Sequence, residues 1–120
     1  MKFNFDKYQA AGNDFIIIDN RSLIFPKDNA YIISQMCNRQ MGIGADGLIL
    51  VQNSTKGDFK MIYFNADGKP GSLCGNGSRC VFAFARSLNI VKNKGIFEAA
   101  GGLHFASVKC FCLPTNLQFS

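Results

Sequence analysis

The alternation of apolar and polar positions predicts a series of short strands. In FNFDKYQ (3–9) aromatic side chains alternate with polar ones, as in a half-buried strand. The segment FIIID (15–19) contains consecutive isoleucines and predicts a buried strand, because β-branched side chains favour extended backbone. Further strands are predicted at LILVQ (48–52), DFKMIYFN (58–65), IFEAA (96–100) and LHFASVKCF (103–111).

Two segments instead place apolar residues at helical spacing. Residues 28–38, DNAYIISQMCN, combine an apolar stripe with Asp28 as a capping residue. Residues 81–90, VFAFARSLNI, repeat the same spacing. The resulting order, β-β-α-β-β-α-β-β, has no regular βαβ alternation, so we expect an α+β domain with mostly antiparallel strands.

Composition and charge narrow the possible partners. A chain of 120 residues, 48% hydrophobic and 18% charged, suits a single globular domain. The net charge of +5 comes from scattered basic residues, so we expect no nucleic-acid partner. No apolar signal region or membrane-length apolar stretch occurs, so we expect no membrane partner. We expect a cytoplasmic protein whose cysteines are reduced.

The segment SLCGNGSRC (72–80) is the main candidate for chemistry. Cys74 directly precedes a predicted helix whose exposed first turn is Gly75-Asn76-Gly77. A helix start presents unpaired N–H groups and partial positive charge, which lower a thiol pKa and hold a carboxylate or phosphate. Most free cysteines are inert core residues, however, so the local sequence leaves a reactive and an inert Cys74 both open. Cys37 and Cys80, within apolar helical segments, fit the inert description.

We expect no metal site. Cys74 and Cys80 are too far apart, and Cys110 and Cys112 too close, for the paired ligands of structural zinc. The only histidine, His104, is flanked by apolar residues and is expected to be structural.

Four motifs occur together in a characteristic order: AGNDF (11–15), GIGADGLIL (42–50), FNADG (64–68) and CGNGSRC (74–80). In order and spacing they resemble the N-terminal half of diaminopimelate epimerases. The resemblance implies two similar α+β domains, each a curled, mostly antiparallel sheet around a central helix, with the active site between them. Residues 1–109 would form the first domain and residues 110–120 an atypical tail.

The resemblance also implies a mechanism. The family interconverts LL- and meso-diaminopimelate, a precursor of lysine and peptidoglycan, without a cofactor or metal. Two cysteines, one from each domain, face opposite sides of the substrate Cα; one removes the proton and the other returns it. Cys74 matches the first-domain base. The substrate contacts map to Asn13, to Asn65, and to Gly75 and Asn76, whose backbone helps to hold the α-carboxylate.

The sequence departs from the family pattern in several respects, two of which bear on the active site. Gly47 stands where many members carry Gln, which removes a possible polar contact with the substrate. No second C-G-[ST]-G motif occurs, so the second catalytic domain is expected to be absent. We therefore expect a truncated or frame-disrupted gene product, or a single domain, that is inactive alone because one base cannot complete the inversion.

Two alternatives remain open. The chain could be a relative on the same fold, such as a proline racemase or a phenazine-biosynthesis-type isomerase, distinguished by how the distal end of the substrate is recognised. It could also be a non-catalytic single domain that forms a homodimer through apolar surface that a second domain would otherwise cover.

Overall fold

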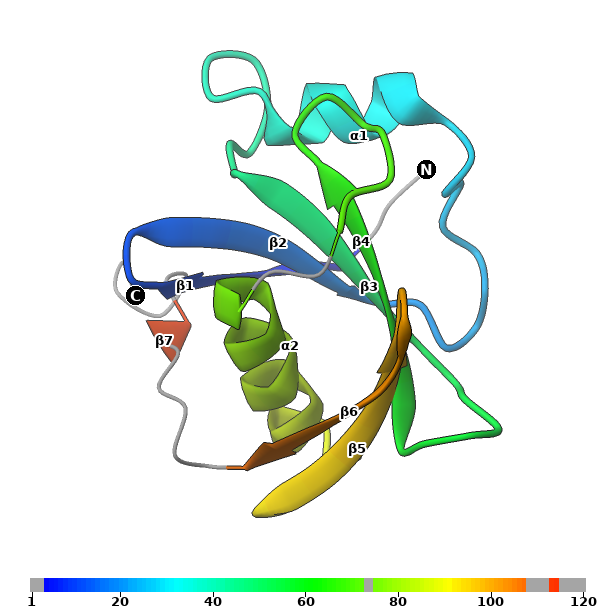
Figure 1. The fold of residues 1–120 in the computed structure, drawn as a ribbon. Helices are drawn as coiled ribbons and strands as arrows, with labels where there is room; N and C mark the ends of the chain where they lie inside the picture. The colour runs from blue at the N-terminus through cyan, green and yellow to red at the C-terminus, as the bar shows by residue number, and fades with distance from the viewer. Residues whose placement is uncertain (1–3, 73–74, 108–112, 115–120) are drawn as a thin grey trace.

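The computed structural model describes residues 4–72, 75–107 and 113–114. In these residues the chain forms one curled seven-stranded sheet and two helices, with strand order β6-β5-β4-β3-β2-β1-β7 (Figure 1). The elements are β1 (Asp6–Ala10), β2 (Asn13–Asp19), α1 (Ala30–Cys37), β3 (Gly47–Gln52), β4 (Phe59–Asn65), α2 (Gly75–Ser87), β5 (Lys94–Ala99), β6 (Gly102–Ser107) and β7 (Leu113–Pro114).

Most strand pairs in the described sheet are antiparallel. Strands that follow each other directly form the antiparallel pairs β1–β2, β3–β4 and β5–β6, and β7 also pairs antiparallel with β1. The two helices connect the parallel pairs, α1 between β2 and β3 and α2 between β4 and β5. The expected class, an α+β domain with a curled and mostly antiparallel sheet, is confirmed.

The central strands are buried on both faces of the sheet. In β2, Phe15 and Ile17 join the core that contains α2, whereas Ile16 and Ile18 join the core that contains α1. All residues of β3 are buried. A strand covered on both faces needs an apolar residue at every position, which explains the continuous apolar runs in these two strands.

Helix α2 lies in the concave side of the curled sheet (Figure 1). Cys80 and Val81 are fully buried there, so the expected packing role of Cys80 is confirmed. The helix begins at Gly75, but its first turn is only partly exposed because Gly77 is buried. Gly77 lies three and four positions before Cys80 and Val81 and so shares their buried face. The expectation of an exposed Gly77 was therefore wrong.

Helix α1 covers the opposite face and begins one residue later than predicted. The side-chain oxygen of Asn29, rather than that of Asp28, accepts a hydrogen bond from the backbone N–H of Ile32 at 3.1 Å. The predicted cap at Asp28 was therefore wrong, because the residue that precedes the helix makes the capping bond. Cys37, at the end of α1, is buried, and burial raises the pKa of its thiol to about 11. Cys37 is thus a protonated core thiol at neutral pH, as expected.

Candidate functional site

The sheet register places the predicted substrate contacts at one end of the central strands. Asn13 is the first residue of β2, and two residues later Phe15 pairs with Gly47 of β3. Gly47 in turn pairs with Asn65, the last residue of β4. Because neighbouring strands lie about 4.8 Å apart, Asn65 is separated from Phe15 by about 10 Å across the sheet.

Asn13 also contacts the first turn of α2 directly. Nδ2 of Asn76 donates a hydrogen bond to Oδ1 of Asn13 at 2.6 Å. Oδ1 of Asn76 accepts a hydrogen bond from Nη1 of Arg79 at 3.1 Å. Two predicted contact residues, far apart in the sequence, are therefore joined side chain to side chain.

Charged residues contact Asn13 and its neighbour Asp14. Oδ2 of Asp46 accepts hydrogen bonds from Nδ2 of Asn13 at 3.2 Å and from the backbone N–H of Asp14 at 3.1 Å. Nη2 of Arg39 bridges the two carboxylates, at 2.8 Å from Asp14 and 3.1 Å from Asp46. The Lys7 ammonium lies 2.9 Å from Asp14. We call these four residues, Lys7, Asp14, Arg39 and Asp46, the charged network.

The network keeps Asp14 ionised. Burial by itself raises the pKa of Asp14. The hydrogen bonds and the charges of Arg39 and Lys7 lower the pKa, and their combined effect is larger than that of burial. The net result is a pKa well below the ordinary range of an aspartate. Asp14 is therefore an anion at neutral pH and anchors both cations beside Asn13.

Asn65 lies apart from the Asn13–Asn76 pair. It closes a tight turn, since its backbone N–H donates to the Lys69 carbonyl at 2.9 Å and its carbonyl accepts from Gly68 at 2.9 Å. Within the described residues, the Asn65 side chain makes no hydrogen bond to Asn13 or Asn76. The structure thus brings Asn13, Gly75 and Asn76 together and places Asn65 at the same end of the sheet, two strands away from Asn13.

The space next to Gly47 is filled by Tyr63. A Cβ at position 47 would lie 2.6 Å from Cε1 of Tyr63 and 2.8 Å from the carbonyl oxygen of Phe64. The Tyr63 ring is held in turn by an edge-on contact with Phe15 at 6.0 Å. A glutamine at position 47 would require this ring to move, so Gly47 and Tyr63 form a matched pair.

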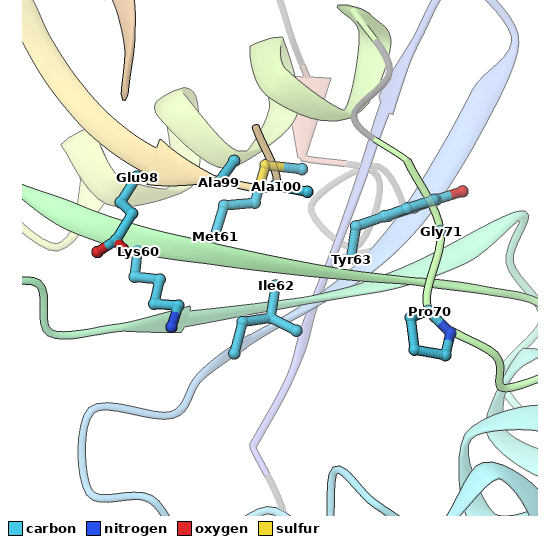
Figure 2. A pocket seen from close by; sticks show the side chains of 9 residues that line it. All are labelled: Lys60, Met61, Ile62, Tyr63, Pro70, Gly71, Glu98, Ala99 and Ala100. Atoms are coloured by element: carbon cyan, nitrogen blue, oxygen red, sulfur yellow. The ribbon is translucent and has the colours of Figure 1, made fainter. Parts of the chain in front are cut away.

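A pocket of about 410 Å³ opens beside this region, where β4 and β5 diverge (Figure 2). The two strands pair only at Phe59↔Phe97 and Lys60↔Glu98. Beyond these pairs the segment after β4 takes the place of β5: Pro70 bridges to Phe64, and the Gly71 N–H donates to the Tyr63 carbonyl at 3.0 Å. The pocket is lined by Lys60, Met61, Ile62, Tyr63, Pro70, Gly71, Glu98, Ala99 and Ala100.

Cys74 lies outside the described residues, as do Cys110 and Cys112, so its role stays a prediction. Its neighbour in the sequence, Gly75, is exposed and begins α2. Among the atoms of the described residues, a Cβ added at Gly75 would meet none within 4 Å. The first N–H groups of a helix have no partner within the helix. In α2 these include the backbone N–H groups of Gly75 and Asn76.

His104 has the structural position expected of it. Its ring stacks on Phe97, with the ring centroids 5.5 Å apart. Within residues 4–72 and 75–107, no three His, Cys, Asp or Glu side chains are grouped as a metal site would require. Neither of the described helices is both long enough and apolar enough to cross a lipid bilayer.

The residues of this site that the sequence analysis missed are all charged. Asp14 and Asp46 stand inside the quoted motifs AGNDF and GIGADGLIL, and Arg79 stands inside CGNGSRC. Asp14 could have been proposed as a site residue from the sequence, because its carboxylate directly follows Asn13 at the start of a predicted strand. Arg39 had no such signal, because only the folded loops bring it to the two carboxylates.

Comparison with known proteins agrees with the motifs. Residues 5–110 match the sequence model of the family described as diaminopimelate epimerase. A diaminopimelate epimerase of Flavobacterium psychrophilum is 58% identical over 102 residues, which cover 85% of this chain and 40% of the relative. One of Chlorobaculum tepidum is 54% identical over 80 residues, which cover 67% of this chain and 31% of the relative. The chain thus spans well under half the length of these relatives.

Solved structures with lower identity share the fold. A phenazine biosynthesis protein of the PhzF family from Bacillus anthracis aligns with TM-score 0.69 and 22% identity, covering 89% of this chain and 36% of that one. A methylitaconate-delta-isomerase aligns with TM-score 0.71 and 17% identity, covering 88% of this chain and 34% of that one. The match over residues 5–110 and the high identity to the curated relatives show that the chain belongs to the diaminopimelate epimerase family.

Proposed function

We propose that these residues form the N-terminal half of a cofactor-independent diaminopimelate epimerase, with Cys74 as one of its two bases. The observation that carries the proposal is the hydrogen bond of 2.6 Å between Asn13 and Asn76. It joins two family substrate contacts at the start of α2, and Cys74 directly precedes that helix in the sequence.

The chemistry follows from the donors at this site. The backbone N–H groups of Gly75 and Asn76, at the start of α2, bind the substrate α-carboxylate, because a helix start attracts anions. The Cys74 thiolate takes the proton from Cα, so the C–H bond breaks and an S–H bond forms. A second cysteine, from the other half of the enzyme, protonates the opposite face of Cα. The configuration is thereby inverted.

The proposed substrate is the small amino acid diaminopimelate, in its LL- or meso-form, and the proposed role is in lysine and peptidoglycan precursor synthesis in the cytoplasm. The relatives that support this are named diaminopimelate epimerase and are 58% and 54% identical. The phenazine biosynthesis protein and the methylitaconate-delta-isomerase are only 22% and 17% identical, which supports the fold alone.

The test is Cα hydrogen exchange of diaminopimelate in D₂O with the 120-residue chain, followed by NMR, with chiral chromatography to detect inversion. We expect little or no inversion, because Cys74 is the one base supplied, and we expect diaminopimelate to slow alkylation of Cys74 by iodoacetamide. The buried Cys37 is the internal control and should stay unmodified with or without ligand. Inversion at an enzymatic rate would contradict the one-base proposal, and unchanged alkylation would contradict substrate binding by this half.

A second candidate is a non-catalytic domain that self-associates. The observation that favours it is the edge strand β6, where the Phe105 side chain is 83% exposed and Leu103 is 49% exposed. Apolar side chains on an open sheet edge promote association with another chain.

A further inference from the structure

We propose that Asp46 is a positioning residue that fixes the orientation of the Asn13 and Asn76 amides, so that both present N–H groups to a carboxylate. The nature of the ligand rests on the proposed function. The orientation of the amides does not, because it is a property of the protein without ligand.

Four side chains, those of Asp46, Asn13, Asn76 and Arg79, form a chain of hydrogen bonds with a charged group at each end. An asparagine amide has a donor side and an acceptor side, and rotation by about 180° exchanges them. At one end of the chain, the ionised Asp46 carboxylate is only an acceptor, so it must face Nδ2 of Asn13. At the other end, the Arg79 guanidinium is only a donor, so it must face Oδ1 of Asn76.

The middle of the chain agrees with both ends. With Nδ2 of Asn13 directed to Asp46, its Oδ1 is left to accept from Asn76, and this bond is observed at 2.6 Å. With Oδ1 of Asn76 directed to Arg79, its Nδ2 is left to donate, and it does so to Asn13. Rotating either amide would place two donors or two acceptors against each other at one of these contacts. The anion and the cation therefore fix both amides.

Asp46 is itself held firmly enough to do this. Its backbone N–H donates to the Asp14 carbonyl at 2.9 Å, and its Oδ2 accepts from the Asp14 N–H at 3.1 Å. Nη2 of Arg39 lies 3.1 Å from its other carboxylate oxygen. These contacts hold the carboxylate in place behind Asn13.

As a consequence, the groups available to a ligand at this site are N–H hydrogen-bond donors. Each Nδ2 carries two hydrogens, and one of them is engaged by a described residue: Asn13 donates to Asp46, and Asn76 donates to Asn13. The second hydrogen of each amide adds to the backbone N–H groups of Gly75 and Asn76 at the start of α2. Such a set favours a carboxylate and disfavours the ammonium group of the same amino acid. A rotated Asn13 would direct its carbonyl oxygen at the carboxylate and repel it.

The first experiment uses NMR of the ¹⁵N-labelled 120-residue chain without ligand. Asp46→Asn keeps the shape of the side chain but removes the acceptor-only end, so the Asn13 and Asn76 side-chain amide resonances should both shift, while backbone resonances in the two cores stay in place. Asp28→Asn is the matched control, since it removes an exposed carboxylate that has no contact with either amide, and it should shift neither. Unchanged Asn13 and Asn76 resonances in Asp46→Asn would overturn the proposal.

The second experiment measures diaminopimelate affinity by NMR titration. Asp46→Asn should weaken binding about tenfold, because a hydrogen bond to a charged group is lost or misdirected. In an Asn13→Ala background the same substitution should have no further effect, since Asp46 acts through Asn13. Equal weakening in both backgrounds would show that Asp46 acts otherwise and would overturn the proposal. If the wild-type chain binds no diaminopimelate, the proposed function fails for this half, whereas the amide resonances still decide the orientation.

Discussion

Asp14 shares its charge with two cations at the start of β2. Burial raises the pKa of Asp14, but hydrogen bonds from Arg39 and Lys7 lower it by a larger amount. The net pKa lies well below that of an aspartate in an unfolded chain. The folded state therefore binds fewer protons than the unfolded state in acid. The stabilisation is complete above the unfolded pKa of about 3.9 and is lost as the pH falls towards the folded value.

We expect Asp14→Asn to lower the free energy of unfolding at pH 7 by about 1–3 kcal/mol, because two charged hydrogen-bond donors lose their anion. Urea unfolding at pH 7 and pH 3 measures this. The wild type should lose more stability than the variant between the two pH values. An equal loss in both proteins would contradict the role of Asp14, and Asp28→Asn, at an exposed position, serves as the control.

Cys74 should react as a thiolate below the pH at which a free cysteine does. The positive end of α2 follows it directly in the sequence, and a helix start stabilises the anion. Alkylation rates measured against pH, with each site read by peptide mass spectrometry, should give an apparent pKa below about 8.5. Cys37, whose pKa is raised to about 11 by burial, should remain unreactive in the same samples. An apparent pKa at or above that of a free cysteine would argue against an activated Cys74.

Asn13, Gly75 and Asn76 could be predicted as substrate contacts because they lie in AGNDF and CGNGSRC, two motifs that resemble those of diaminopimelate epimerases. The sequence could not predict the hydrogen bond between Asn13 and Asn76, since it depends on where α2 lies against the sheet. Arg39 was missed for the same reason: it reaches Asp14 and Asp46 only through loop geometry that no local pattern encodes.

The β3–β4 pair depends on a residue without a side chain. A Cβ at Gly47 would approach the Tyr63 ring to 2.6 Å and the Phe64 carbonyl to 2.8 Å, and the carbonyl cannot move without disturbing the strand ladder. We expect Gly47→Ala to lower the free energy of unfolding by about 1–3 kcal/mol, as measured by chemical denaturation. Gly75→Ala should leave stability nearly unchanged, because no atom of the described residues lies within 4 Å of the added Cβ. Wild-type stability in Gly47→Ala would contradict this close packing.

The predicted strands were found because burial on two faces leaves a strong apolar signal in β2 and β3. The predicted start of α2 at Gly75 is confirmed, although Gly75 and Gly77 are poor helix formers and the apolar spacing begins only near Cys80. The strand predicted from Ile96 begins two residues earlier, at Lys94, so Gly95 lies within β5. Tertiary packing decides this boundary.

The edge strand β6 of the described sheet is a candidate surface for association between two chains. β6 ends the described sheet order, and its Phe105 side chain is 83% exposed. We expect the 120-residue chain to self-associate as its concentration rises, and Phe105→Glu to weaken this association, because a charge on an edge strand opposes pairing. Light scattering coupled to size exclusion measures the mass. Tyr31→Glu, at another exposed aromatic on α1, is the control, and a monomer at every concentration would contradict the prediction.

The segment that leaves β4 is held by its backbone. Pro70 and Gly71 pair with Phe64 and Tyr63 in the place that β5 vacates, so main-chain bonds set the path towards Cys74. Such a path tolerates amino-acid replacement, and relatives can diverge at its surface positions without losing it. Gly71 is the exception, because an added Cβ would lie 2.6 Å from the Tyr63 ring and 2.7 Å from Oδ1 of Asn65. We therefore expect relatives to keep a glycine at position 71, while the residues beside it in the segment after β4 differ between relatives.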